Sequence, residues 1–236
     1  MIDSGHPLYI DFPNPQLADQ DGLLAQGGNL NIHTLLSAYQ QGIFPWFNEN
    51  QPILWWSPDP RLILYTAEMY VSRSLNKTIR SKRFSITCGL AFKQVIEQCS
   101  QPRDPIHADS FEKNQPQTWI TPSMKEAYID LHDKGYAQSI ECWKDNQLVG
   151  GLYGVTIAGM FFGESMFSKV SDSSKVSLYY LCKFLKKNGT TWLDCQVDSN
   201  HLSSLGAVNV SRNEFLHMIK KQQKSPNQLI WENFST

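Results

Sequence analysis

The feature that most constrains the fold is a block of large aromatic residues interleaved with prolines at residues 42–61. Proline fixes its own φ angle and has no N–H to donate, so this density of prolines argues against a regular helix or a central strand. Large rings in such a segment need a surface to bury against. We therefore expect most of them to pack into the core and one or two to face a ligand. The block contains Phe44, Trp46, Phe47, Trp55 and Trp56 among Pro45, Pro52, Pro58 and Pro60.

The composition is typical of a globular protein with a sizeable core. The 236 residues are 41% hydrophobic and suit one large domain or two smaller ones. Because 21 basic residues nearly balance 22 acidic ones, nucleic-acid binding would have to depend on a local patch. No run approaches the ~18 apolar residues of a membrane span, and the first residues lack a signal-peptide pattern. We expect a cytoplasmic protein that makes no membrane contact.

Cofactor and metal motifs are missing from the sequence. The five cysteines are widely spaced without a C-x-x-C pair, and the six histidines lack metal-ligand spacing. We therefore expect free buried thiols in a reducing cytoplasm and no metal. Cys195 with His201 is a weak candidate for a thiol nucleophile, because Cys195 falls on the apolar face of a predicted strand. The sequence also lacks a Walker A loop, and Gly150–Gly154 is no dinucleotide fingerprint, because a helix is not expected to follow it.

Hydrophobic periodicity predicts an α+β fold. The chain has an apparent antiparallel meander of three strands, followed by a helix, a strand and a final helix, which indicates a mixed, largely antiparallel sheet. Residues 101–118 are polar and are expected to form a loop. We expect helices from Asn31 to Gly42, over 71–83, from Phe92 to Cys99, from Thr121 to Gly135, over 173–187, briefly over 199–205, and after the capping box Ser211–Glu214, with strands over 60–66, 136–143, 147–156, 159–167 and 191–197.

The sharpest local signal is the strand Trp192–Val197. Period-two alternation places Leu193, Cys195 and Val197 on one face, and Asp194 beside Gln196 on the other. The strand lies between two predicted helices, so it is expected to be internal to the sheet, where both polar side chains need partners. The two are either a satisfied structural pair or a carboxylate and an amide that line a cleft.

A second signal is an acid within the apolar strand 159–167. Glu164 is costly there unless it is paired or near solvent. Regular alternation puts Phe162, Glu164 and Met166 on one face and Phe161 on the other, so a bulge near Gly163 is needed if Glu164 and Phe161 serve one pocket. A glutamate at such a cleft could receive a substrate ammonium.

A basic stripe lies on the predicted helix 71–83. Arg73, Lys77 and Arg80 fall on one helical face, and Lys82 and Arg83 extend the charge without an intervening acid. The stripe is either a solvated helix face or a patch that contacts phosphates.

Several long motifs, taken together and in order, resemble the leucyl/phenylalanyl-tRNA–protein transferase family of bacteria over roughly residues 12–216. The motifs are Asp21-Gly-Leu-Leu-Ala-Gln-Gly-Gly28, Gly42-Ile-Phe-Pro-Trp-Phe47, Pro52-Ile-Leu-Trp-Trp-Ser-Pro-Asp-Pro-Arg61, Thr118-Trp-Ile-Thr121, Gly150-Gly-Leu-Tyr-Gly-Val155, Gly163-Glu-Ser-Met-Phe167, Ser174-Lys175, Asp194-Cys-Gln196 and Ser204-Leu-Gly-Ala207.

The resemblance implies an activity, a set of partners and a fold. The family transfers Leu, Phe or, less readily, Met from aminoacyl-tRNA to proteins that begin with Arg or Lys, which marks them for N-degron proteolysis. Because the aminoacyl ester is already activated, no cofactor, ATP or metal is implied. The fold implied is a small N-terminal α/β domain, expected over residues 1–66, and a larger GNAT-like, acetyltransferase-type domain, expected over residues 67–236.

The resemblance also implies roles for individual residues. Asp194 and Gln196 would be the catalytic pair with Glu164 beside them, and Gln196 is expected to orient the amine rather than act as a base. Where the family often has Phe, and sometimes Met, this chain has Leu181 and Leu152, which leaves its preference between Leu and Phe open. Trp46 and Trp119 would hold the aminoacyl-adenosine end, Phe161, Leu152, Met166, Leu181 and Tyr39 would contact the substrate, and Arg73, Lys77 and Arg80 would contact the tRNA acceptor stem.

Two other functions fit parts of the pattern. An acyl-CoA-dependent N-acetyltransferase would need a Gly-rich pyrophosphate loop before the helix at 173–187, and the sequence has none there. A non-catalytic tRNA-binding module would not depend on Asp194 for any chemistry.

Overall fold

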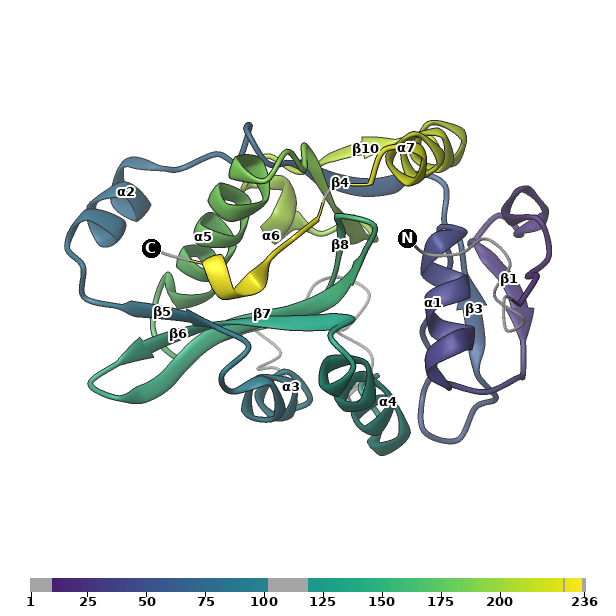
Figure 1. Ribbon diagram of the computed structural model, residues 1–236, viewed down its shortest axis with the longest axis horizontal. Coiled ribbons are helices and arrows are strands. Elements are labelled where there is room, and N and C mark those ends of the chain that lie inside the picture. Colours follow the sequence, from purple (N-terminus) through teal and green to yellow (C-terminus); the bar gives the residue numbers. More distant parts are fainter. Residues whose placement is uncertain (1–9, 102–118, 227, 235–236) are drawn as a thin grey trace.

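The computed structural model describes residues 10–101, 119–226 and 228–234, which form two sheets flanked by helices (Figure 1). The smaller sheet has the strand order β1-β3-β2, and the larger has the order β10-β4-β9-β8-β7-β6-β5. The elements are η1 (Pro15–Leu17), β1 (Leu23–Gln26), α1 (Ile32–Gln40), β2 (Phe44–Pro45), β3 (Leu54–Trp56), β4 (Arg61–Tyr65), α2 (Arg73–Arg80), β5 (Ser85–Cys88), α3 (Phe92–Cys99), α4 (Pro122–Asp133), β6 (Ala137–Lys144), β7 (Gln147–Ile157), β8 (Met160–Ser168), α5 (Ser173–Lys187), β9 (Trp192–Gln196), α6 (Asn200–Ser203), β10 (Val208–Val210), α7 (Arg212–Lys224) and η2 (Trp231–Asn233).

The predicted α+β class with a mixed, largely antiparallel sheet is confirmed. Neighbouring strands of the large sheet run antiparallel except β8 and β9, which are parallel. The predicted meander is β6-β7-β8, and β9 is internal between β4 and β8, as expected. The two edge strands, β5 and β10, are only four and three residues long and were not predicted. The predicted boundary at residue 66 assigns β4 to the N-terminal unit, whereas β4 pairs with β9 and β10 inside the large sheet.

The expectation that prolines exclude a central strand from the aromatic block is wrong. Strand β3 is the central strand of the small sheet and pairs with both β1 and β2. This is possible because Pro52 precedes β3 and Pro58 follows it, so every residue of β3 keeps its N–H. Pro45 lies in β2 at the sheet edge, where a missing donor is tolerated.

Helix ends follow the capping residues seen in the sequence. Asn31, Thr121 and Ser211 are the N-caps of α1, α4 and α7, and each side-chain oxygen accepts an N–H three residues further on. Gly135 follows α4 with φ +81°, a left-handed conformation that glycine adopts without steric cost. Local sequence therefore sets where these helices begin and end.

Two hydrophobic clusters cover opposite faces of the large sheet. In Figure 1, α5 lies on one face, and α3 and α4 lie on the other. The α5 cluster includes Leu152 and Phe161 of the sheet, whereas the cluster with α1, α3 and α4 includes their neighbours Tyr153 and Phe162. This alternation positions the site, because each sheet face receives its own set of side chains. Residues 101–118, predicted to be a loop, lie almost entirely outside the described residues.

Cys88, Cys142, Cys182 and Cys195 are free thiols, as expected. Among the described helices, none has the length and apolar character needed to span a membrane.

Candidate active site

A cavity of about 910 Å³ opens where β8 and β9 separate. The two parallel strands share a single paired position, Phe162 with Asp194, and the segments that follow them line the cavity on both sides. Such a volume is within the range of small-molecule and cofactor sites. Most of the predicted site residues line this cavity.

The bulge expected near Gly163 is confirmed and falls on Glu164. Gly154 pairs with Gly163 and Tyr153 pairs with Ser165, which leaves Glu164 as the extra residue of β8. An extra residue reverses the alternation beyond it. As a result Phe161 and Met166 pack in the same α5 cluster, although regular alternation would have placed them on opposite faces.

Glu164 is almost completely buried and has three hydrogen-bond partners. Tyr39 Oη lies 2.7 Å from Oε1, Tyr128 Oη lies 2.9 Å from Oε2, and Gln196 Nε2 donates to Oε1 over 2.8 Å. The two phenol oxygens are themselves 2.5 Å apart. Burial, opposed by these hydrogen bonds and assisted by the charge of Asp194, raises the pKa of Glu164 to about 7.

Asp194 is fully buried in a bidentate ion pair with Arg61. Arg61 Nε donates to Oδ1 over 2.8 Å and Nη2 to Oδ2 over 2.6 Å. The guanidinium lies between the rings of Phe44 and Phe215, with Cζ 4.7 and 4.5 Å from their centroids. Asp194 has no exposed surface although it borders the cavity, so its carboxylate is a partner of Arg61 at the edge of the opening.

Gln196 faces the cavity from a left-handed backbone conformation, with φ +67°. Its N–H donates to Asp194 Oδ1 over 2.9 Å, and its side-chain nitrogen donates to Glu164. Within the part of the chain that the structure describes, its amide oxygen has no hydrogen-bond partner. The turn also places Val197 against the α1 cluster, so the expectation that Val197 shares a face with Leu193 and Cys195 is wrong.

The apolar wall of the cavity is formed by one face of the sheet together with residues of α5. All four predicted aliphatic and aromatic pocket residues line it, and Leu178, Leu193 and Cys195 complete the surface. Burial raises the pKa of the Cys195 thiol well above its usual value, so it stays protonated and is no nucleophile. The four predicted residues are Leu152, Phe161, Met166 and Leu181.

Two indoles border the same cavity. Trp46 and Trp119 are both half-buried and line it. Trp46 is supported from behind, because Trp56 Nε1 donates to the Trp46 carbonyl over 2.7 Å and the two rings lie 5.9 Å apart. Phe47 and Trp55 of the same block are buried, as expected for rings that pack into the core.

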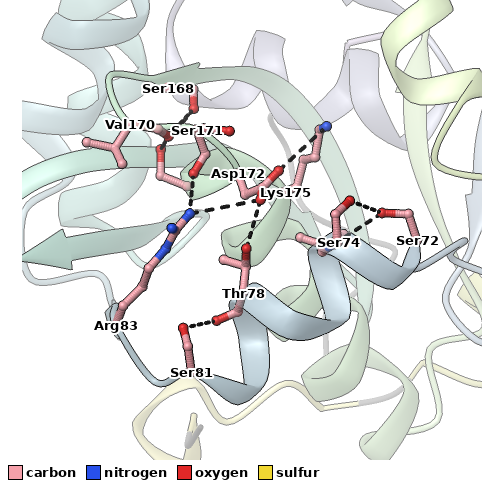
Figure 2. Close-up of polar contacts among 12 residues, drawn as sticks. Ser72, Ser74, Thr78, Ser81, Arg83, Ser168, Val170, Ser171, Asp172 and Lys175 are labelled. Carbon is pink, nitrogen blue, oxygen red and sulfur yellow. Dashed lines mark hydrogen bonds and ion pairs between the residues drawn. The ribbon is translucent and has the colours of Figure 1, made fainter.

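The rim of the cavity is tied to the basic helix by the loop before α5. Figure 2 shows Asp172 at the centre of this contact: it accepts a hydrogen bond from Thr78 of α2 over 2.9 Å, and pairs with Arg83 at 3.9 Å and Lys175 at 3.8 Å. Arg83 also donates to the Ser171 carbonyl over 3.0 Å. The partly buried carboxylate of Asp172 thus links α2 to the loop at the rim of the cavity.

The predicted basic stripe lies on α2. Arg73, Lys77 and Arg80 line one shallow depression on the outside of the helix, and Leu75 of the opposite face is buried. Three cations on one surface repel each other unless an anion offsets their charge.

Two important residues were not found from the sequence, and one was placed differently. Arg61 is the last residue of the aromatic block, and Tyr128 was expected only as a core residue. Each of them contacts its partner across a long stretch of chain. Tyr39, expected to contact substrate, has no exposed surface and instead binds Glu164. The sequence signal for both tyrosines was that each phenol falls on the apolar face of a helix, where its hydroxyl needs a buried partner.

Metal binding is not indicated by the residues that the structure describes. No group of three or more His, Cys, Asp or Glu side chains in residues 10–101, 119–226 and 228–234 is arranged to hold an ion.

The amino-acid sequence matches a known protein family along most of its length. A family profile described as "Leucyl/phenylalanyl-tRNA protein transferase" matches residues 63–220, and a profile for the N-terminal domain of that transferase matches residues 28–59. Relatives named leucyl/phenylalanyl-tRNA–protein transferase include those of Azoarcus sp. (strain BH72), 49% identical over 84% of this chain and 81% of that one, and Legionella pneumophila (strain Corby), 47% identical over 91% and 92%.

Solved structures give only distant similarities. A GCN5-related N-acetyltransferase from Kribbella flavida is 10% identical with a TM-score of 0.39, over 75% of this chain and 60% of that one. L-PGS from Bacillus licheniformis is 9% identical with a TM-score of 0.38, over 72% and 52%.

Proposed function

This chain belongs to the leucyl/phenylalanyl-tRNA–protein transferase family. We propose that it uses the cavity to transfer Leu, Phe and, less readily, Met from aminoacyl-tRNA to proteins that begin with Arg or Lys. The product would mark the acceptor for N-degron proteolysis in the cytoplasm, where charged tRNA is available. The supporting observation is that apolar wall, two indoles and the Glu164–Gln196 pair border one cavity.

The reaction is the aminolysis of an ester. The acceptor's α-amine attacks the aminoacyl carbonyl, a C–N bond forms, the C–O bond to the ribose breaks, and the amine proton passes to the leaving hydroxyl. The ester is already activated, so the main task of the enzyme is to hold both reactants in a reactive arrangement, which can contribute several kcal/mol.

Gln196 is the group best placed to orient the amine. Its free amide oxygen can accept an N–H of the amine, while its nitrogen is held by Glu164. A neutral amide is a very weak base, so this role is orientation and not proton removal. Asp194 acts through Gln196, because its carboxylate is buried and binds the Gln196 N–H.

The two indoles suit the terminal adenosine of the tRNA. Trp46 and Trp119 border the cavity and each offers an aromatic surface for a base to stack on. Stacking of this kind contributes about 1–3 kcal/mol per base and does not depend on the identity of the rest of the tRNA.

The cationic side chain of the acceptor requires an anion near the amine. Asp172 and Asp198 both border the cavity, and Asp198 is exposed, whereas Asp172 is already engaged with Thr78, Arg83 and Lys175. An exposed carboxylate at the rim can pair with either Arg or Lys.

The apolar wall predicts selection by shape alone. Replacing Leu181 of α5 with Ala enlarges the apolar part of the cavity. We therefore expect the ratio of kcat/KM for Phe to kcat/KM for Leu to rise about tenfold, because one or two methylenes are worth about 1–3 kcal/mol. Steady-state transfer from Phe-tRNA and Leu-tRNA measures it. Ile219→Ala, a buried truncation on α7, is the matched control: it should destabilise similarly and leave the ratio unchanged. An unaltered ratio in Leu181→Ala would remove Leu181 from the pocket.

The basic stripe predicts salt-dependent tRNA binding. We expect the triple variant with Arg73, Lys77 and Arg80 changed to Ala to bind tRNA with a weaker salt dependence. The negative slope of log K for tRNA binding against log salt should become less steep by about 2–3, because each phosphate contact contributes about 0.7–0.9. Filter binding across a salt series measures it. The matched control is Lys220→Ala with Lys221→Ala on α7, toward the other end of the molecule from α2 (Figure 1). Equal slopes for the wild type and the α2 variant would contradict the stripe's role.

The deciding experiment is transfer of labelled Leu, Phe and Met from tRNA to peptides that begin with Arg, Lys or Ala. We expect products with Arg and Lys and none with Ala. Release of free CoA from an acyl-CoA donor would instead support an N-acetyltransferase. Tight binding of tRNA without any transfer would support a binding module.

A further inference from the structure

The contacts around Glu164 cannot all be hydrogen bonds unless the group holds one proton more than its two phenols supply. Three O···O contacts close a ring: Tyr39 with Tyr128 at 2.5 Å, Tyr39 with Glu164 at 2.7 Å, and Tyr128 with Glu164 at 2.9 Å. Each contact at such a distance requires a hydrogen between the oxygens. Burial raises the pKa of both phenols well above the usual value for tyrosine, so each phenol keeps its single proton. These two protons supply the hydrogens for two of the three contacts.

We propose that Glu164, Tyr39 and Tyr128 share three protons in the resting enzyme, with Glu164 as a neutral carboxylic acid and both tyrosines as its positioning residues. This inference rests on the proposed function and assigns a state to one of its groups. In the arrangement that fits the contacts, Glu164 Oε2–H donates to Tyr128, Tyr128 donates to Tyr39, and Tyr39 donates to Oε1. Oε1 is then the carbonyl oxygen, which agrees with its second hydrogen bond from Gln196 Nε2.

Among the residues that the structure describes around Glu164, the nearest cation, Arg61, is already paired. Arg61 of β4 gives Nε and Nη2 to Asp194 of β9, and the remaining Nη1 donates to the Gly42 carbonyl over 3.3 Å. Tyr39 from α1 and Tyr128 from α4 face Glu164 directly, and Tyr153 from β7 packs edge-on against Tyr128. Asp194 adds a like charge. An unpaired buried carboxylate is costly, and uptake of a proton avoids that cost.

A neutral acid here favours the reactive form of the acceptor. An ionised carboxylate beside Gln196 would stabilise the α-ammonium, which has no lone pair for attack. The carboxylic acid does not, so the amine can bind in its free form. With a pKa of about 8, roughly one tenth of α-amines are in that form at pH 7. The ring itself gains and loses no proton over the reaction.

The direct test is the ¹³C spectrum of enzyme labelled at the glutamate carboxyl carbon, titrated in the absence of substrates. We expect one resonance to remain at the protonated position at about pH 6, well above the ordinary glutamate range of about 4.3, and to be missing from Glu164→Gln. If that variant does not fold, the wild-type spectrum still decides, because no glutamate protonated at that pH would overturn the proposal. The measurement does not depend on transfer activity, so its failure is distinct from failure of the proposed function.

Stability reports the raised pKa of Glu164, and kinetics supply a readout that a purely structural Glu164 would not change. Its raised pKa means that the native state holds the proton more tightly than the unfolded chain, so wild-type stability relative to Glu164→Gln should fall as pH rises from about 5 to about 7. The ratio of wild-type to Glu164→Gln transfer rates should also fall between about pH 6 and about pH 8. A difference in stability and a ratio of rates that are both independent of pH would overturn the proposal.

Discussion

Replacing Gln196 with glycine is expected to abolish aminoacyl transfer without lowering the stability of the fold. Gln196 has φ +67°, a conformation that costs a residue with a Cβ about 1–2 kcal/mol and glycine almost nothing. The relief offsets the lost hydrogen bond to Glu164, worth about 1 kcal/mol. The transfer rate should fall by about 10²-fold or more, as when a group aimed at the reacting centre is removed.

Urea unfolding and single-turnover transfer, measured on the same preparations, test this separation of effects. Gln196→Ala should lose activity equally but be less stable than Gln196→Gly by about 1 kcal/mol, because it keeps the strained backbone. Ala158→Gly is the matched control: Ala158, in the turn between β7 and β8, has φ +51°, so the change relieves a similar backbone and should leave transfer intact. A fully active Gln196→Gly enzyme would show that the side chain does not orient the amine.

Replacing Asp194 with alanine is expected to cost both stability and activity. The change leaves Arg61 as an uncompensated charge with 1% of its surface exposed, and breaking a buried pair in this way costs about 3–5 kcal/mol. It also removes the acceptor of the Gln196 N–H, so the turn that aims Gln196 loses its anchor. We expect a lower urea midpoint and a large loss of transfer. Glu97→Ala, which breaks the exposed pair with Lys125, is the control and should cost less than about 1 kcal/mol.

A double variant separates the two losses. Arg61→Met with Asp194→Leu removes both charges together, and such apolar replacements are often neutral or stabilising. We expect stability close to that of the wild type and transfer still impaired, because Gln196 remains without its anchor. Recovery of full activity in the double variant would mean that Asp194 serves only to neutralise Arg61.

Features that depend on neighbouring residues could be predicted from the sequence. The N-caps Asn31, Thr121 and Ser211 act within one turn, and the strands of the meander carry their own alternation. The bulge at Glu164 could also be anticipated, because the apolar and acidic residues around Gly163 do not fit one alternation. The strand β3 was not predicted because the number of prolines in the block was considered, and not their positions, which leave Leu54–Trp56 free of proline.

Features that depend on distant partners could not be predicted. Nothing near Asp194 in the chain indicates that Arg61 will take both of its oxygens, and nothing near Glu164 indicates Tyr128. The sequence by itself determined which side chains carry the chemistry, because residue type and local period decide which groups share a strand or a helix face. Only the tertiary structure decided which of them are buried against one another, because the cost of burying a charge depends on partners brought together by the whole fold.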